Sequence, residues 1–180
     1  MHAVYSRLFE PKAPLQAALE AFASKHKWTR SKPFIAVHLR TGLDFQSDPT
    51  RMVASAFDAV FDCVVNRTRS LGEPNWHVAS DTKHVYQHFA GRFRRLGWDP
   101  ARLMSIYNLP EAVPFHVDRF GGDGIRSVDA EVYVHLDYWL LSHASKVFAS
   151  TSGFSRTAAV VGGHKHVVLV PHCLQQTVLY

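Results

Sequence analysis

The feature that most constrains the fold is an apolar run at residues 34–39, which lies between Pro33 and Gly42 and ends in polar residues. A short run bounded by a proline and a glycine is typical of a strand buried on both faces of a parallel sheet. Parallel strands need long crossover connections, usually helices that cover the sheet. The run therefore predicts an α/β protein.

Strand-like and helical segments alternate along the rest of the chain. Further short apolar runs, each a predicted strand, occupy residues 76–79, 103–107, 147–149 and 166–170. Apolar residues recur at helical spacing in residues 15–27, 49–70, 82–96, 128–145 and 154–161, whereas residues 108–123 have no clean period and predict a loop. This alternation predicts a Rossmann-like, doubly wound parallel sheet of about five strands. We interpret residues 1–32 as an N-terminal helix and connector, and residues 33–180 as the sheet-forming domain.

Composition narrows the classes of protein that fit. The 180 residues are 47% hydrophobic, which favours a packed globular domain over disorder. No apolar stretch reaches the ~18 residues of a membrane span, and the first residues lack the apolar core of a signal peptide. A net charge of +5 fits an anionic partner, or a mildly basic surface without function. The basic residues are dispersed and lack interleaved aromatic residues, which argues against nucleic-acid binding.

The two cysteines, Cys63 and Cys173, are predicted to be buried free thiols, because unpaired cysteine is usually buried. No Cys/His spacing matches a zinc site, so no metal is predicted. Asn66, Arg67 and Thr68 form a sequon for N-linked glycosylation. Such triplets also arise by chance, so this one leaves the compartment open.

Polar residues follow three of the predicted strands. His38 lies at the carboxyl end of the first strand, which Arg40 and Asp44 follow; Asp81 follows the second strand, and small hydroxyl residues follow the strand at 147–149. Because the carboxyl ends of parallel strands meet at one edge of a sheet, these side chains are expected to converge. A guanidinium at that edge suits a phosphate, since its donors match phosphate oxygens in pairs. An anionic ligand is therefore predicted there.

The residues after the strand at 147–149 lead directly into a helix. Ser152 and Ser155 supply hydroxyl groups, and Gly153 allows a close backbone approach. The first N–H groups of a helix lack internal partners and attract negative charge, so a phosphate fits this position. The alternative is an ordinary helix N-cap by Ser152 or Ser155. Neither a Walker loop nor the dinucleotide glycine fingerprint is present in the sequence.

Asp137 lies in the middle of an apolar helical segment. A buried carboxylate needs a partner, and Asp137 could accept hydrogen bonds from a nucleotide base or ribose. The alternative is an exposed acid, or one that is paired with a nearby cation.

These motifs together resemble those of the GDP-fucose-dependent fucosyltransferases, which include protein O-fucosyltransferases and α1,6-fucosyltransferases. Residues 38–44 resemble the His-x-Arg signature of that group, and residues 78–82 are similar to its second motif. Residues 137–155 resemble the third motif, an Asp-led helix, a strand and a turn of small residues, Phe and Ser. The order and spacing agree from about residue 33 to residue 163.

The resemblance implies one half of a GT-B fold, namely the C-terminal donor-binding domain of an inverting transferase that needs no metal or cofactor. Its partners would be GDP-fucose and an acceptor protein or glycan, and a separate N-terminal domain would bind the acceptor. The compartment would be the lumen of the ER or Golgi. Arg40 would be catalytic, holding the β-phosphate and supporting the departure of GDP, while Asp137 would contact the guanosine. The other implied donor-binding residues are His38, Asp44, Asp81, Ser152, Gly153, Phe154 and Ser155.

Two other functions stay open on the sequence. The chain could be a nucleotide-binding module without transfer activity, because the acceptor domain that the resemblance implies lies outside it. It could also belong to a glycosyltransferase with the same architecture that uses a different sugar nucleotide, such as a UDP-sugar.

Overall fold

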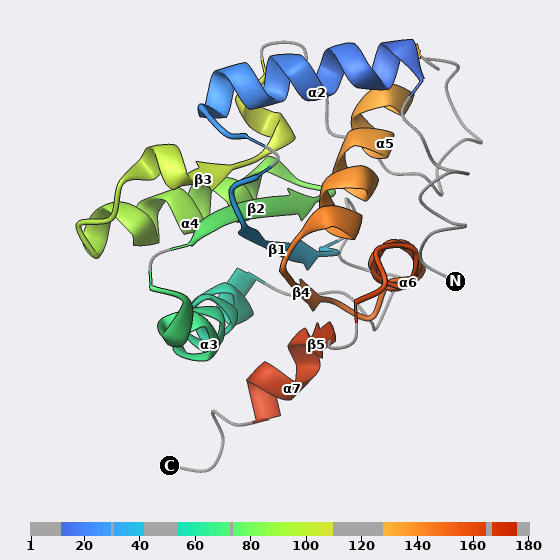
Figure 1. Ribbon diagram of the computed structural model, residues 1–180. Helices are drawn as coiled ribbons and strands as arrows, with labels where there is room; N and C mark the ends of the chain where they lie inside the picture. The colour runs from blue at the N-terminus through green and yellow to red at the C-terminus, as the bar shows by residue number, and fades with distance from the viewer. Residues whose placement is uncertain are drawn as a thin grey trace.

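The computed structural model describes residues 12–29, 31–41, 54–72, 74–109, 128–164 and 167–175 (Figure 1). The strands are β1 (Phe34–Leu39), β2 (Asn75–Ser80), β3 (Leu103–Met104), β4 (Lys146–Ala149) and β5 (Val167–Leu169). The helices are α2 (Ala13–His26), α3 (Phe57–Thr68), α4 (Lys83–Arg95), α5 (Val128–His143), α6 (Gly153–Val161) and α7 (Val170–Gln175). Short 3-10 turns occupy Ala54–Ala56, Arg69–Leu71, Pro100–Arg102 and Ile106–Asn108.

The strands form one parallel sheet in the order β3-β2-β1-β4-β5. β1 pairs with β2 along its whole length, and residues 35–38 of β1 pair on its other side with residues 146–149 of β4. The chain builds outward from β1 to β3, then returns to the other side of β1 for β4 and β5. This is the order of the first five strands in a Rossmann-like, doubly wound sheet, and it confirms the predicted α/β fold.

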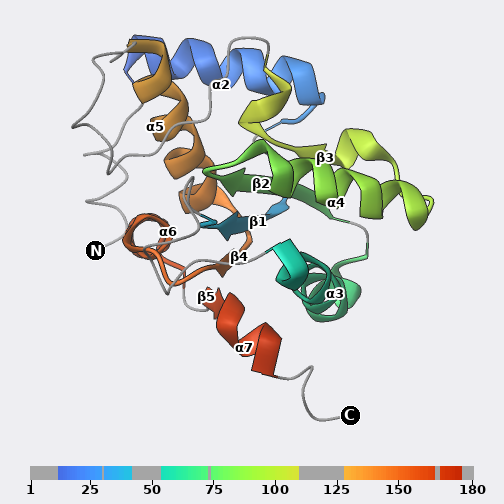
Figure 2. The same ribbon diagram turned by 180° about the vertical axis from the view of Figure 1, so that it is seen from behind.

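Helices cover both faces of the sheet (Figures 1 and 2). Alternate residues of β1 point to opposite faces, and each set joins a different hydrophobic core. Phe34 and Ala36 belong to the core that also contains Phe22 of α2 and Leu140 of α5. The other residues of the strand, Ile35, Val37 and Leu39, belong to the core beneath α3 and α4. A strand that is buried on both faces explains the continuous apolar run from which the fold was predicted.

Several predicted boundaries shift in the structure. The helix predicted at residues 49–70 begins as a 3-10 turn at Ala54, and residues 49–53 lie outside the described residues. β3 ends at Met104 because the Ser105 hydroxyl accepts the Tyr107 N–H at 3.4 Å and begins a 3-10 turn. Residues 110–123 of the predicted loop also lie outside the described residues. No helix among the described segments is long and apolar enough to cross a membrane.

Helix α7 is not among the predicted helices, because Pro171 directly follows the strand predicted at residues 166–170 and a proline there favours the end of that strand. The helix runs from Val170 to Gln175, so the proline occupies its second residue. Proline is well tolerated in the first turn of a helix, where the missing N–H has no intrahelical acceptor. Pro171 therefore starts a helix here.

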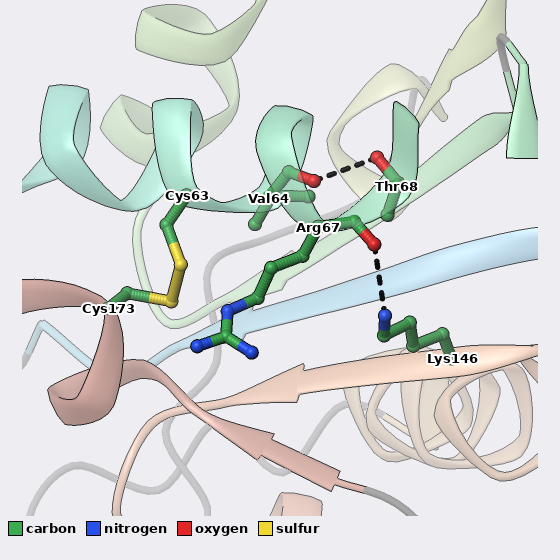
Figure 3. The surroundings of a disulfide bond; sticks show 6 residues. All are labelled: Cys63, Val64, Arg67, Thr68, Lys146 and Cys173. Atoms are coloured by element: carbon green, nitrogen blue, oxygen red, sulfur yellow. Dashed lines mark hydrogen bonds between the residues drawn. A yellow bond between two sulfur atoms is a disulfide. The ribbon is translucent and has the colours of Figure 1, made fainter. Parts of the chain in front are cut away.

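The prediction of two free thiols is wrong: Cys63 and Cys173 form a disulfide between α3 and α7 (Figure 3). Their Cα atoms lie 5.6 Å apart, within the usual range for a disulfide, and the two residues are separated by 110 positions in the sequence. The fold brings them together because α7, which follows edge strand β5, packs against α3. Nothing local in the sequence signals this pairing.

Candidate functional site

The candidate site lies where the carboxyl ends of β1 and β4 meet. Ser150, directly after β4, donates its backbone N–H to the His38 carbonyl at 2.9 Å. Its hydroxyl oxygen accepts the backbone N–H of Arg40 at 3.1 Å and lies 3.3 Å from His38 Nδ1. β1 and β4 flank the point at which the strand order reverses, which is where open α/β sheets bind ligands. The predicted convergence of these two strand ends is present in the structure.

Ser150 also contacts the His38 ring. Its hydroxyl has one hydrogen and two lone pairs, so while it accepts the Arg40 N–H it can either donate to His38 Nδ1 or accept from it. Burial lowers the pKa of His38 from 6.5 to about 4, while the Asp81 carboxylate opposes this and the Arg40 charge adds to it. His38 is therefore a neutral hydrogen-bond donor at neutral pH.

Asp81 ties the end of β2 to the end of β1. Its Oδ1 accepts the backbone N–H of Thr41 at 2.9 Å and the Thr41 hydroxyl at 2.7 Å. Ser80 adds a second tie, since its hydroxyl donates to the Leu39 carbonyl at 2.8 Å. Asp81 does not cap the helix that follows, because Thr82 is the N-cap of α4. Asp81 thus holds the segment that carries Arg40.

The start of α6 lies at the same edge. Ser152 is its N-cap and accepts the Phe154 N–H at 3.3 Å, while the buried Ser155 hydroxyl donates to the Ser152 carbonyl at 3.4 Å. The structure therefore confirms the alternative interpretation of Ser152 as an ordinary helix N-cap. A Cβ added at Gly153 would meet nothing within 4 Å, so there is room above the first turn. Backbone N–H groups at this position can still bind an anion.

Phe154 connects the start of α6 to the β1 end. Its half-buried ring lies 5.5 Å from the His38 ring and 5.4 Å from the Tyr138 ring of α5, between centroids. These separations are typical of packed aromatic pairs. Phe154 therefore provides an apolar wall beside the polar groups of His38 and Ser150.

Asp137 pairs with a residue that the sequence reasoning missed. His77 Nε2 lies 3.0 Å from Asp137 Oδ1, a distance typical of an ion pair, although its angles fall outside those of a hydrogen bond. Both residues are buried, His77 completely. Burial raises the pKa of the Asp137 carboxyl, and His77 opposes that rise. Asp137 is thus a buried acid whose neighbour is His77, and the exposed alternative is wrong.

Tyr107 lies near both carboxylates. Burial, with smaller contributions from Asp137 and Asp81, raises the pKa of its phenol, and its hydroxyl donates to the Ser80 carbonyl at 2.8 Å. The signal for His77 is a polar residue inside the strand predicted at 76–79. Strand alternation places it on the face of β2 shared with Ala79, opposite Ala36 of β1.

The structure thus brings His38, Arg40 and Asp81 together with residues 150–155, and places Asp137 in a second cluster with His77. Asp44 lies outside the described residues. Within the described segments, no group of three or more His, Cys, Asp or Glu side chains could hold a metal ion. No protein-family model, curated protein or solved structure matches this chain.

Proposed function

We propose that this chain is the donor-binding domain of an inverting, metal-independent fucosyltransferase and binds GDP-fucose across the carboxyl ends of β1 and β4. The observation that carries the proposal is the position of the Arg40–His38–Ser150 group at the reversal point of the strand order. A cation, a neutral imidazole donor and a helix start converge there. Together they suit a diphosphate, and the motif resemblance selects GDP-fucose among diphosphate sugars.

Arg40 has the central role in the proposed reaction. An acceptor oxygen forms a bond to C1 of fucose while the bond from C1 to the β-phosphate oxygen breaks, and GDP leaves with that electron pair. A base takes the acceptor proton, and we assign that base to the separate acceptor domain. Negative charge grows on the departing diphosphate, where a preorganised donor contributes roughly 3–4 kcal/mol in the transition state. The Arg40 guanidinium and the N–H groups at the start of α6 supply such donors.

His38 and Asp81 keep this arrangement in place. In this proposal the neutral His38 carries its proton on Nε2 and donates it to a phosphate oxygen, without adding a second full charge beside Arg40. Asp81 holds Thr41, so the Arg40 backbone is fixed on both sides, by Ser150 and by Thr41. The buried Asp137–His77 pair joins α5 to β2. We propose that Asp137 acts on the guanosine from this position.

The disulfide supports the proposed compartment. Disulfides persist in oxidising environments such as the ER lumen and are rare in the cytosol. The Cys63–Cys173 bond therefore favours the secretory lumen that the resemblance implies.

Calorimetry with GDP tests the proposal directly. We expect wild-type chain to bind GDP and Arg40→Ala to weaken binding about 100-fold, the loss of one charge-assisted phosphate contact of ~3 kcal/mol. Arg95→Ala is the matched control, because Arg95 is an exposed arginine in the last turn of α4. No binding at millimolar GDP, or equal affinities for wild type and Arg40→Ala, would contradict the proposal.

A nucleotide panel and a transfer assay separate the other two functions. Preference for UDP over GDP would contradict fucose as the donor sugar while keeping a diphosphate site. GDP binding without fucose transfer, even when the acceptor domain is supplied, would favour a binding module over an enzyme.

A further inference from the structure

We infer that Asn66 on α3 carries an N-linked glycan, an inference that rests on the luminal compartment of the proposed function. Asn66, Arg67 and Thr68 form the single Asn-x-Ser/Thr triplet in the sequence. The Asn66 side chain is exposed, so an attached glycan has access to solvent. Two features of α3 and its surroundings support the inference, and a third determines when the modification can occur.

The first feature is the position of Asn66 around the helix. Val60, Val64 and Thr68 recur every four residues and form the buried stripe of α3. Asn66 lies two residues from Val64, about 200° around the helix axis. It therefore occupies the centre of the solvent face, where a bulky glycan leaves the core packing undisturbed.

The second feature is the disulfide on the same helix. Cys63 lies one turn before Asn66 and is bonded to Cys173 of α7 (Figure 3). N-linked glycans are added in the oxidising compartment where disulfides form. A sequon alone is common by chance. The disulfide adds to it because it favours the compartment in which a sequon can be glycosylated.

The third feature concerns the Thr68 hydroxyl. It is buried and donates to the Val64 carbonyl at 2.7 Å, as Figure 3 shows. The transferase that modifies a sequon must recognise this hydroxyl, and the folded helix hides it. Modification must therefore precede the folding of α3.

The chain order provides time for this. Cys173 is synthesised 110 residues after Cys63, which at ~5–20 residues per second is roughly 5–20 s. During that interval the disulfide cannot form, and α3 lacks its partner α7. In the reaction, the Asn66 amide nitrogen forms a bond to C1 of an oligosaccharide carried on a lipid diphosphate. The C1–oxygen bond breaks, the lipid diphosphate leaves, and the amide loses a proton.

The test is translation of the full chain behind a cleavable secretion leader in the presence of rough microsomes. Wild type and Thr68→Ser are expected to show one mobility step that endoglycosidase removes. Asn66→Gln is expected to lack it, and Asn75→Gln, which changes an asparagine outside the sequon, is expected to keep it. Absence of the step in wild type, or its persistence in Asn66→Gln, would overturn the inference.

A second measurement uses the natural chain. Peptides of protein purified from the cells that express it are treated with a glycan-removing amidase, which converts a glycosylated asparagine to aspartate. Mass spectrometry is expected to find that conversion at Asn66, and an unconverted Asn66 would refute the inference. Neither readout involves nucleotide: a glycan without GDP binding would remove only the donor assignment, and GDP binding with unmodified Asn66 would remove only this inference.

Discussion

Removal of the Cys63–Cys173 disulfide is expected to destabilise the domain strongly, because the bond closes a loop that spans most of the sheet. For a separation of 110 residues, the chain-entropy relation gives about 4.8 kcal/mol at 25 °C. A domain of this size loses about 2–4 °C in Tm per kcal/mol, so we expect a decrease of roughly 10–20 °C. Thermal unfolding of wild type with and without dithiothreitol, followed by circular dichroism, measures it.

A double variant, Cys63→Ala with Cys173→Ala, separates the cross-link from the packing of the sulfur atoms. If the cross-link is the cause, reduced wild type and the double variant unfold within a few degrees of each other. Oxidised wild type unfolds at a much higher temperature. A change below about 2 °C on reduction would refute the loop-closure reasoning. So would a double variant as stable as the oxidised chain.

Three further perturbations test the site and its supports. Because the pKa of His38 is 6.5 unfolded and about 4 folded, the unfolded chain binds more protons between these values, and stability decreases as the pH is lowered. Between pH 7 and pH 5 His38 alone is expected to account for a loss of about 2 kcal/mol in urea titrations. His26, whose pKa burial also lowers to about 4, adds to that loss, so His38→Gln is expected to remove only the His38 part. Gly162→Ala is expected to cost ~1–3 kcal/mol, since its Cβ would lie 2.0 Å from a backbone oxygen of α5. Gly153→Ala, whose Cβ meets nothing, is the stability control for it. Asp81→Ala is expected to cost ~2–4 kcal/mol by leaving the buried Thr41 N–H without its acceptor, and Asp81→Asn about half that, measured in the same titrations.

The central sheet was predictable because its signals are local. The run at 34–39 coincides with β1, and the helix at 82–96 differs from α4 by one residue at each end. Both depend on periodicity and on flanking residues, which a sequence displays directly. The convergence of His38 and Ser150 followed from parallel strand direction alone, without knowledge of the strand order.

The missed features depend on long-range contacts. To predict the disulfide one must know that α7 packs on α3, and no local sequence pattern indicates that contact. His77 lies in a strand whose apolar character hid its pairing with Asp137, a residue of a helix far along the chain. Helix α7 was missed because a proline can stand both at the end of a strand and in the first turn of a helix, and the sequence alone does not distinguish the two at Pro171.

The uneven strand lengths bear on aggregation. The six-residue strands β1 and β2 lie inside the sheet, whereas the two edges are β3 with two residues and β5 with three. An exposed edge is a template on which another chain can add a strand, and a short edge offers few backbone groups for it. Over the part of the chain that the structure describes, the two sheet edges therefore present little surface for edge-to-edge association. Aggregation is instead expected to require opening of the sheet beside β1.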